Sequence, residues 1–392
     1  MNYDSLTIDT QTVMSNSFHF DGGLLGQLKQ FKDGQIEIIV TQIVAAEISR
    51  RLREKTLAAK EALESAHRKA QLFGLKKDGE AVLPEILDTD ALAKERLQKY
   101  FDDIGATILS PDDVPMRDLV KTYTDALPPF AKSGNKKSEF PDAIALLSLE
   151  HWAKRNKKRL LAVSGDADWA AFAERSVHID VVPVLSDALE LLQQDLDEAN
   201  DIAQGLLGAI RNGTGEVLAE EFNKLLAEAI SNTYPYADAD SSYRFDVDGI
   251  ELTLDDYEID QDEEWLPAQV VQTGRSVIVA DVEVRAFVTA EASFSLQVHD
   301  SIDDDFVTIG TTTICKEEEE TIDVLVTFEG DFEKGKVSIT NVELIKGLKS
   351  VYFGDVEPDY GEPDYDDLSE PDKEQGEPFA SEDEPLIEES EE

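Results

Sequence analysis

The sequence predicts an α/β domain with a central parallel sheet, followed by a smaller, mostly β domain and an acidic tail. Three observations lead to this prediction: short apolar runs alternate with helix-period segments over residues 1–194, period-two runs dominate residues 243–354, and acids with prolines fill residues 355–392. Residues 195–242 are expected to be a helical connector and a linker. The 392 residues have the length of two or three domains.

Five short apolar or β-branched runs predict the strands of the first domain. They are residues 5–9, 36–40, 104–109, 160–164 and 178–182. Between them, apolar residues recur three and four positions apart, as in Val44, Ile48 and Leu52, which is the spacing of one helix face. Another helix is expected to begin near Pro141, because proline suits the first helical turn. Apolar strands that alternate with helices indicate a parallel sheet covered on both faces.

The second half of the chain has a different character. Residues 186–231 are expected to form one or two helices that break at residues 212–215, and residues 232–242 a polar linker. Six alternating or β-branched runs then predict strands, at residues 243–254, 276–289, 293–299, 306–315, 321–328 and 336–344. From Asp355 onward, 18 acids, one base and five prolines leave little to bury, so this tail is expected to be disordered.

The net charge is distributed unevenly. The whole chain carries a formal charge of −48, which argues against a membrane-surface protein or a protein that coats duplex nucleic acid. Residues 1–200 hold 33 acids and 25 bases, a net charge of −8, so the remaining residues carry −40. The charge therefore does not argue against a small nucleic-acid-binding pocket in the first domain.

Cysteine content and hydropathy set further bounds. The single cysteine, Cys315, excludes an intramolecular disulfide and a thiolate-rich metal site. No apolar run approaches the ~18 residues of a membrane span. The N-terminus has no cationic stretch followed by an apolar one, which a signal peptide would need. A cytoplasmic protein without membrane contact is the expectation.

Several acids occupy positions for which the predicted fold has no structural need. Asp9 follows the first strand, and Asp166 and Asp168 follow the strand at residues 160–164. The carboxyl ends of parallel strands form the edge where open sheets bind ligands. The alternative is an ordinary turn or helix N-cap, and Asp168 in particular is placed to cap a helix at residues 169–174.

Two further acids lie on helix faces that are expected to be buried. Glu47 shares a face with Ile43 and Val44, and Asp142 lies in the first turn of its helix, where the helix dipole also favours it. A buried carboxylate is costly unless a cation, a polar partner or water meets it. Converging carboxylates suit Mg²⁺ or Mn²⁺, which can activate water to hydrolyse a phosphodiester.

The order and context of these acids resemble the PIN domain family, in a bacterial PIN-like branch, over about residues 1–194. The matching features are Asp9 after a strand, Glu47 in the next helix, the run at residues 137–146 and the run at residues 164–169. The resemblance implies a three-layer α/β/α domain whose acidic pocket binds one or two Mg²⁺ or Mn²⁺ ions. It also implies endoribonuclease cleavage of single-stranded RNA that leaves 5′-phosphate and 3′-hydroxyl ends.

Matched position by position, the resemblance assigns roles to six residues. The catalytic and metal-binding acids would be Asp9, Glu47, Asp142 and Asp166, with Asp168 as a fifth metal ligand or a supporting group. Ser164 matches the small hydroxyl residue that often precedes the last acids, and we expect it at the substrate. One departure is visible: Gln11 follows Asp9-Thr10 where many members have asparagine.

Two basic clusters flank these acids. Residues 50–77 hold nine bases and three acids, and residues 132–159 hold eight bases and three acids. Lys136 and Lys137, just before Asp142, are the best candidates for phosphate contacts. For residues 55–77 the favoured alternative is a solvated helix face with ordinary ion pairs.

The leading interpretation is a metal-dependent endoribonuclease, with a role as a toxin or host-defence effector suggested by the resemblance. Two alternatives stay open: a structure-specific DNA nuclease, and an inactive nucleic-acid-binding or scaffold protein. Single-stranded RNA is the expected partner, with DNA ranked lower. The β domain is a candidate for binding a second copy of the chain or a regulatory partner.

Overall fold

The structure is a computed structural model. It describes residues 3–73, 88–130, 139–193, 196–259, 268–300 and 305–358. The tail expected to be disordered begins at residue 355, but Asp355 ends a strand and the buried Val356 donates its N–H to the Asp240 carbonyl at 2.7 Å. From position 359 onward the predicted tail lies outside the described residues.

The first domain is built on a five-stranded parallel sheet with the order β3-β2-β1-β4-β5. Its strands are β1 (Ser5–Ile8), β2 (Glu37–Thr41), β3 (Thr107–Leu109), β4 (Leu160–Val163) and β5 (Ile179–Val182). Every pair of neighbours is parallel. The predicted parallel α/β domain is confirmed, with one shortened strand: residues 104–106 lie before β3 because α4 extends to Ile104.

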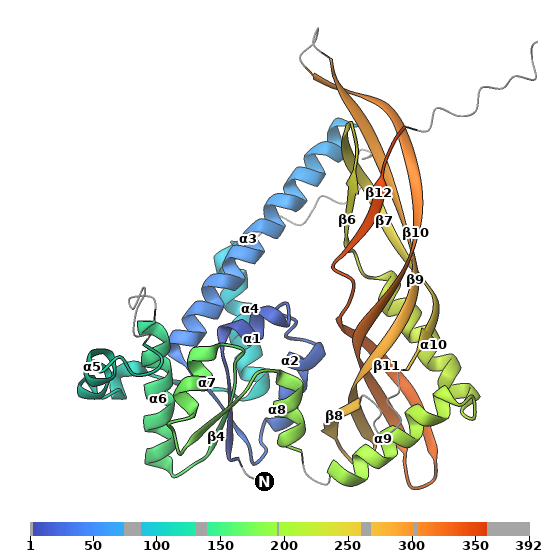
Figure 1. Ribbon diagram of the computed structural model, residues 1–392. Helices are drawn as coiled ribbons and strands as arrows, with labels where there is room; N and C mark the ends of the chain where they lie inside the picture. Colours follow the sequence, from blue (N-terminus) through green and yellow to red (C-terminus); the bar gives the residue numbers. More distant parts are fainter. Residues whose placement is uncertain are drawn as a thin grey trace, which may run out of the picture.

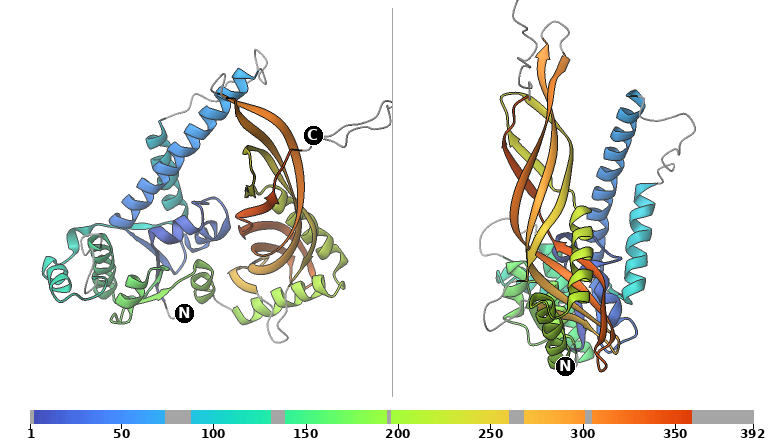
Figure 2. Two further views of the ribbon diagram at one scale, coloured as in Figure 1. Left: turned by 45° about the horizontal axis from the view of Figure 1, so that its top comes forward. Right: turned by 90° about the vertical axis from the view of Figure 1, so that its right-hand side faces the viewer.

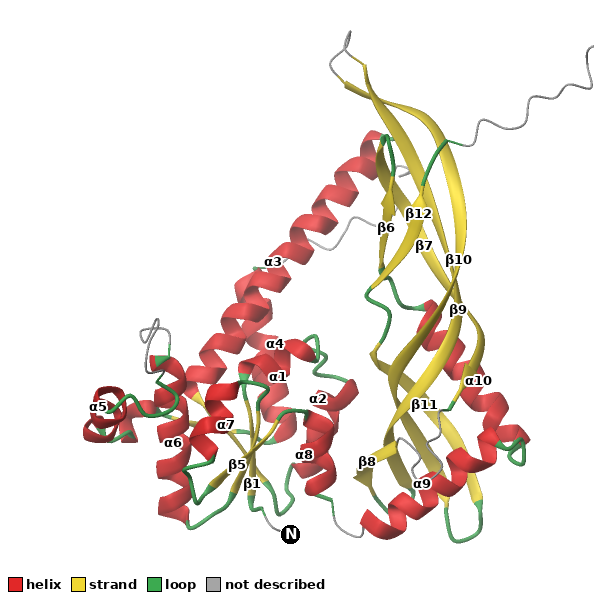
Figure 3. Ribbon diagram, in the orientation of Figure 1, coloured by secondary structure: helices red, strands yellow, loops and turns green. Residues whose placement is uncertain are grey.

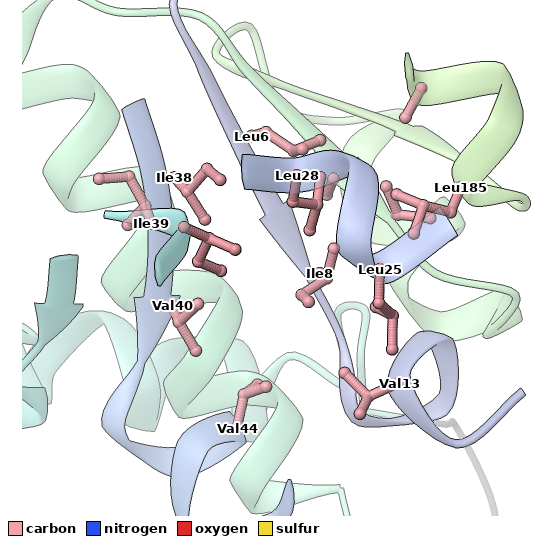
Figure 4. Packing of buried hydrophobic residues seen from close by; sticks show 14 of the residues in the cluster. Leu6, Ile8, Val13, Leu25, Leu28, Ile38, Ile39, Val40, Val44 and Leu185 are labelled. Carbon is pink, nitrogen blue, oxygen red and sulfur yellow. The ribbon is translucent and has the colours of Figure 1, made fainter. Parts of the chain in front are cut away.

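Helices cover the sheet on both sides, with α6 and α7 on one side and α2 and α8 on the other (Figure 3). The helices of this domain are α1 (Thr10–Ser15), α2 (Gly23–Gln27), α3 (Gln42–Leu72), α4 (Thr89–Ile104), α5 (Met116–Thr124), α6 (Phe140–Asn156), α7 (Ala167–Ala173) and α8 (Leu185–Leu191), with the 3-10 helices η1 (Leu28–Phe31) and η2 (Pro111–Asp113). Leu25, Leu28 and Leu185 gather around Leu6 and Ile8 of the central strand (Figure 4). Burial of these side chains on both faces explains why the strands are continuous apolar runs.

Helix α3 is much longer than the domain requires. Its first turns pack on the sheet through Val44, Ile48 and Leu52, and the rest projects away with α4 running back beside it (Figures 1 and 2). The exposed part carries acids and bases of both signs, which explains how it stays solvated. In the part of the chain that the structure describes, neither this helix nor any other is apolar over enough residues to cross a membrane.

Helices α9 (Leu196–Arg211) and α10 (Glu216–Ser231) lead from the first domain to the second. The predicted break between them is confirmed, and Gly213 adopts a left-handed conformation there that glycine tolerates without strain. Residues 236–240, within the segment expected to be a linker, form the short strand β6 (Tyr236–Asp240). It pairs in parallel with β12 (Ser350–Asp355), which gives its backbone groups hydrogen-bond partners that the local sequence does not reveal.

The second domain is an antiparallel sheet with the order β11-β10-β9-β7, to which β8 adds by pairing with β9. The strands are β7 (Arg244–Glu258), β8 (Ala268–Thr273), β9 (Val277–Asp300), β10 (Asp305–Asp331) and β11 (Lys336–Lys346). Helices α9 and α10 cover one face through Leu207, Phe222 and Leu226. The predicted mostly β domain is confirmed.

Two pairs of predicted strands are each one long strand. The runs at residues 276–289 and 293–299 are both part of β9, and those at 306–315 and 321–328 are both part of β10. The expected interruption in β10 falls at residues 316–320, which instead pair with residues 286–290 of β9. Strand β8, which was not predicted from the sequence, buries Val270 and Val271. Pairing with a neighbouring strand outweighed the local composition in both cases.

The two domains pack against each other. Val271, Val279 and Leu325 of the second sheet belong to the apolar cluster of the first domain. The Gly23 N–H at the start of α2 donates to Glu343 Oε2 at 2.5 Å. Gln193 Nε2, just after α8, donates to the Val271 carbonyl at 2.8 Å. The β domain therefore rests on α2 and α8, and the strand ends that carry the acids stay uncovered by these contacts.

Candidate acidic active site

The candidate site lies where the sheet changes direction. The chain runs from β1 to β2 and β3 on one side, and then returns to β4, which pairs with β1 on the other side. Asp9 follows β1 directly, while Ser164 and Asp166 follow β4. The carboxyl ends of such neighbouring strands form the crevice in which open α/β sheets bind ligands.

Asp9 is buried, with 5% of its surface exposed, and is held by three donors. It is the N-cap of α1: its Oδ1 accepts from the Thr12 N–H at 2.6 Å, with the Thr12 hydroxyl at 2.8 Å. Its Oδ2 accepts from the Ser164 hydroxyl at 2.5 Å. Burial raises the pKa of Asp9, while the hydrogen bonds from Ser164 and Thr12 act in the opposite direction. The carboxylate is therefore rigidly oriented at the end of β1.

Ser164 connects the two strand ends. Its hydroxyl donates to Asp9 and accepts from the Asp166 N–H at 3.1 Å, and the side chain is almost fully buried. Because its one proton is used on Asp9, Ser164 positions the two acids in this structure. Its expected contact with substrate stays a prediction.

Replacing Ser164 with alanine is expected to lower the free energy of unfolding by about 1–2 kcal/mol, because buried Asp9 loses a donor that nothing replaces. Urea unfolding of the variant measures this loss. Ser15→Ala, at an exposed serine of α1, is the matched control and is expected to change little. Equal stability of both variants would show that the Ser164 hydroxyl does not hold Asp9.

Asp166 and Asp168 lie at the start of α7. Asp166 is the N-cap, and its Oδ1 accepts from the Asp168 N–H at 2.7 Å. The expectation that Asp168 caps this helix is therefore wrong: the helix begins at Ala167, two residues earlier than the sequence predicted, because Asp166 supplies the cap. Burial raises the pKa of Asp168, and the charges on Asp166 and Glu139 raise it further.

Asp142 faces the same site from α6, whose first turn contains Pro141 as predicted. Its Oδ1 accepts from Trp169 Nε1 at 3.4 Å. Burial raises the pKa of Asp142 to about 6; the Trp169 hydrogen bond opposes this, and the charges on Asp166, Glu47 and Asp168 add to it. These acids come from three different helices and a strand end, and the fold holds them close together although their charges repel one another. Such an arrangement is typical of a functional site.

Glu47 closes the site on the side of α3. Its Oε2 accepts from the Thr10 hydroxyl at 3.2 Å, and its Oε1 lies 3.3 Å from Arg50. The side chain is 37% exposed, so solvent reaches it. Glu47 therefore faces the acids on one side and a cation on the other.

Four residues that shape the site were not predicted from the sequence. Thr10 contacts Glu47, Thr12 holds Asp9, Trp169 holds Asp142, and the charge on Glu139 acts on Asp168. The signal for Thr12 was present, since a hydroxyl three residues after an N-cap aspartate lies next to its carboxylate. The contact of Trp169 with Asp142 depends on how α6 and α7 pack, which local sequence does not reveal.

The basic residues divide into two groups. Lys136 and Lys137 lie outside the described residues. In α3, Arg50 pairs with Glu54 at 3.6 Å and Lys60 with Glu64 at 3.9 Å, both four residues apart. The Lys60–Glu64 pair is of the kind that the favoured solvated helix face predicts for residues 55–77, whereas Arg50 and Glu54 lie before that range.

The donor set fits a hydrated divalent cation. All five candidates are carboxylates, and the charge that three of them place on Asp142 is what such a cation would neutralise. Among the described residues, no three His, Cys, Asp or Glu side chains are arranged to hold an ion by themselves. Mg²⁺ tolerates this spacing because it keeps several waters and usually takes one or two protein carboxylates. That these carboxylates bind a metal ion stays a prediction.

Comparison with known proteins gives one match. The family model described as PIN domain matches residues 6–169, a range that contains β1 through the start of α7 and all five acids. Comparisons with curated proteins and with solved structures gave no match. The second sheet and the helices that cover it lie outside the matched range.

Proposed function

Because residues 6–169 match the model of the PIN domain family, a family of nucleases, we propose that the protein is a metal-dependent endoribonuclease that cuts single-stranded RNA. One observation carries the proposal: Asp142 is a partly buried carboxylate on which three other acids act, at the crevice of the sheet. The mutual repulsion of these acids costs stability, which favours a chemical role over a purely structural one. A phosphodiester hydrolase uses them to bind a cation next to the scissile phosphate.

The five acids Asp9, Glu47, Asp142, Asp166 and Asp168 would hold Mg²⁺ or Mn²⁺. When bound, the ion supplies Lewis-acid chemistry, since it lowers the pKa of a water and neutralises charge on the phosphate. The chain's own residues supply orientation, because Thr12 and Ser164 fix Asp9 while Trp169 fixes Asp142. Such preorganised groups need no rearrangement during the reaction. The expected products carry 5′-phosphate and 3′-hydroxyl ends, as the family resemblance implies.

Cleavage of labelled single-stranded RNA tests the proposal. We expect the full chain to cut it with Mg²⁺ or Mn²⁺, to stop in excess chelator and to resume when the ion is restored. Single- and double-stranded DNA of the same sequence serve as competing substrates. Asp118→Asn, at an exposed acid of α5 outside the site, should cut as the wild type does.

Three results would contradict the proposal. Cleavage that persists in chelator would remove the metal mechanism. Cutting of DNA in preference to RNA would favour the structure-specific DNA nuclease. RNA binding without cleavage under all these conditions would favour the inactive binding protein.

A further inference from the structure

A groove lies between α1, α3 and α4, and the starts of α1 and α3 lie at the acidic site. It encloses about 480 Å³. Its lining comes from Met14, Ser17, Phe18, Leu52, Lys55, Thr56, Ala59, Leu92, Ala93 and Arg96. Binding sites for small molecules usually measure about 300–1,000 Å³, so this groove can hold one nucleotide-sized group. We call it the α1–α3–α4 groove.

Two of the helices that line the groove, α1 and α3, begin at the acidic site. The hydrogen bond from Thr10 to Glu47 joins the starts of α1 and α3 at 3.2 Å. Met14 lies one turn further along α1 than Thr10, about 6 Å away, and Lys55 lies two turns beyond Glu47, about 12 Å away. A chain bound at the acids therefore reaches the groove without leaving the surface.

The groove combines an apolar floor with cations at its rim. Phe18, Leu52 and Ala93 are buried beneath it, while the apolar side chains of Met14 and Leu92 are 39% and 42% exposed at its edges. Lys55 and Arg96 are exposed at the rim. Arg96 donates to the Phe18 carbonyl at 3.1 Å, which fixes its guanidinium at the wall. An apolar floor flanked by two cations complements a flat base attached to a phosphate.

We propose that the α1–α3–α4 groove binds one unpaired nucleotide of the RNA strand whose neighbouring phosphate lies at the acids. The base lies between Met14 and Leu92, which are the exposed apolar side chains of the lining. Lys55 and Arg96 contact phosphates on the side of this nucleotide that faces away from the acids. This inference rests on the proposed nuclease function and adds to it, because a duplex cannot insert a paired base here. Apolar contact with the face of a base discriminates little between the four bases. We therefore expect the groove to favour single-stranded over paired RNA, with little preference for a particular base.

Filling the groove tests this directly. Ala59→Trp places a large ring at the groove wall, whereas Ala58→Trp places the same ring about 100° further around α3, at an exposed position that does not line it. We expect Ala59→Trp to weaken binding of labelled oligouridine about tenfold relative to Ala58→Trp, measured by fluorescence polarisation in an Asp142→Asn background. Circular dichroism of both variants checks that α3 is intact. Equal RNA affinities of the two variants would overturn the proposal. A groove that binds a protein helix and not RNA would give this result.

The cations give a second, independent measurement. Lys55→Gln is expected to reduce the slope of log affinity against log salt by about 0.7, the value for one lost phosphate contact on a single strand. Lys94→Gln, at an exposed lysine of α4 that does not line the groove, is expected to leave the slope unchanged. Equal slopes for both variants would overturn the role of Lys55.

Failure of the groove and failure of the nuclease are separable. If the wild type cuts RNA and Ala59→Trp binds as Ala58→Trp does, the groove proposal fails while the nuclease stands. If Ala59→Trp loses binding but the wild type cuts nothing, the groove stands and the nuclease fails. When both hold, Ala59→Trp with Asp142 restored is expected to raise KM about tenfold with little change in kcat, because the groove lies away from the reacting phosphate.

Discussion

Replacing Asp142 with asparagine is expected to stabilise the metal-free protein while nearly abolishing RNA cleavage. The carboxylate is partly buried beside three other acids, which raises its pKa to about 6. Asparagine keeps the oxygen that Trp169 contacts but removes the charge. We expect a gain in the free energy of unfolding of about 1 kcal/mol at pH 8, after allowing for solvent screening of this half-buried group.

The direction of the pH dependence follows from the raised pKa of Asp142. Below about pH 4 the carboxyl is protonated in the folded and unfolded protein, so the substitution changes little. As the pH rises from about 4 through 6, the folded protein must carry an unfavourable charge, and the advantage of asparagine grows until it is constant. Urea unfolding of the wild type and of Asp142→Asn in the presence of chelator, from about pH 4 to pH 8, measures this difference in stability.

The same substitution is expected to reduce the cleavage rate at least about a hundredfold, the usual loss when a group that acts on transition-state charge is removed. Asp118→Asn serves again as control and is expected to change neither quantity. A variant that is both less stable and fully active would contradict the assignment. Stability gained at the expense of activity is the signature of a residue retained for chemistry.

Asp281→Asn is expected to produce the larger change in stability, at the contact between the two domains. Asp281 of β9 faces Ser186 and Asp187 of α8, Asp323 of β10 and Glu283 of its own strand. Burial raises the pKa of Asp281 to about 7; the charge on Asp323 adds to this, the Ser186 hydrogen bond opposes it, and Asp187 and Glu283 add further. Gln269 of β8 also faces this cluster and donates to Asp187 at 3.2 Å.

Asp281 therefore destabilises the folded protein at high pH and not at low pH. The penalty is absent below about pH 4, where the carboxyl is protonated in the folded and the unfolded protein, and it grows as the pH rises through about 7. At pH 8 we expect Asp281→Asn to raise the free energy of unfolding by on the order of 2 kcal/mol, and at pH 4 by almost nothing. Glu251→Gln, at an exposed carboxylate of β7, is expected to show no such dependence. Parallel stability curves for wild type and Asp281→Asn would refute the buried charge.

The sequence was informative wherever the signal was local. Fully buried strands such as β4 are continuous apolar runs, and Pro141 and Gly213 marked helix boundaries that the structure confirms. It failed in the second domain, where β10 continues through exposed glutamates and β8 was not predicted. A strand in a sheet is decided by its partners, and residues 286–289 that pair with those glutamates lie about thirty positions away.

For the candidate site, the sequence by itself determined the acids: their residue types, their order and their positions after strands or near the starts of helices. Only the tertiary structure decided how they act on one another. The Ser164 bridge to Asp9, the Trp169 bond to Asp142 and the raised pKa of Asp142 each join segments far apart in the chain. Electrostatic and hydrogen-bonding effects depend on distance in space, and that distance is set by packing of the sheet and its helices.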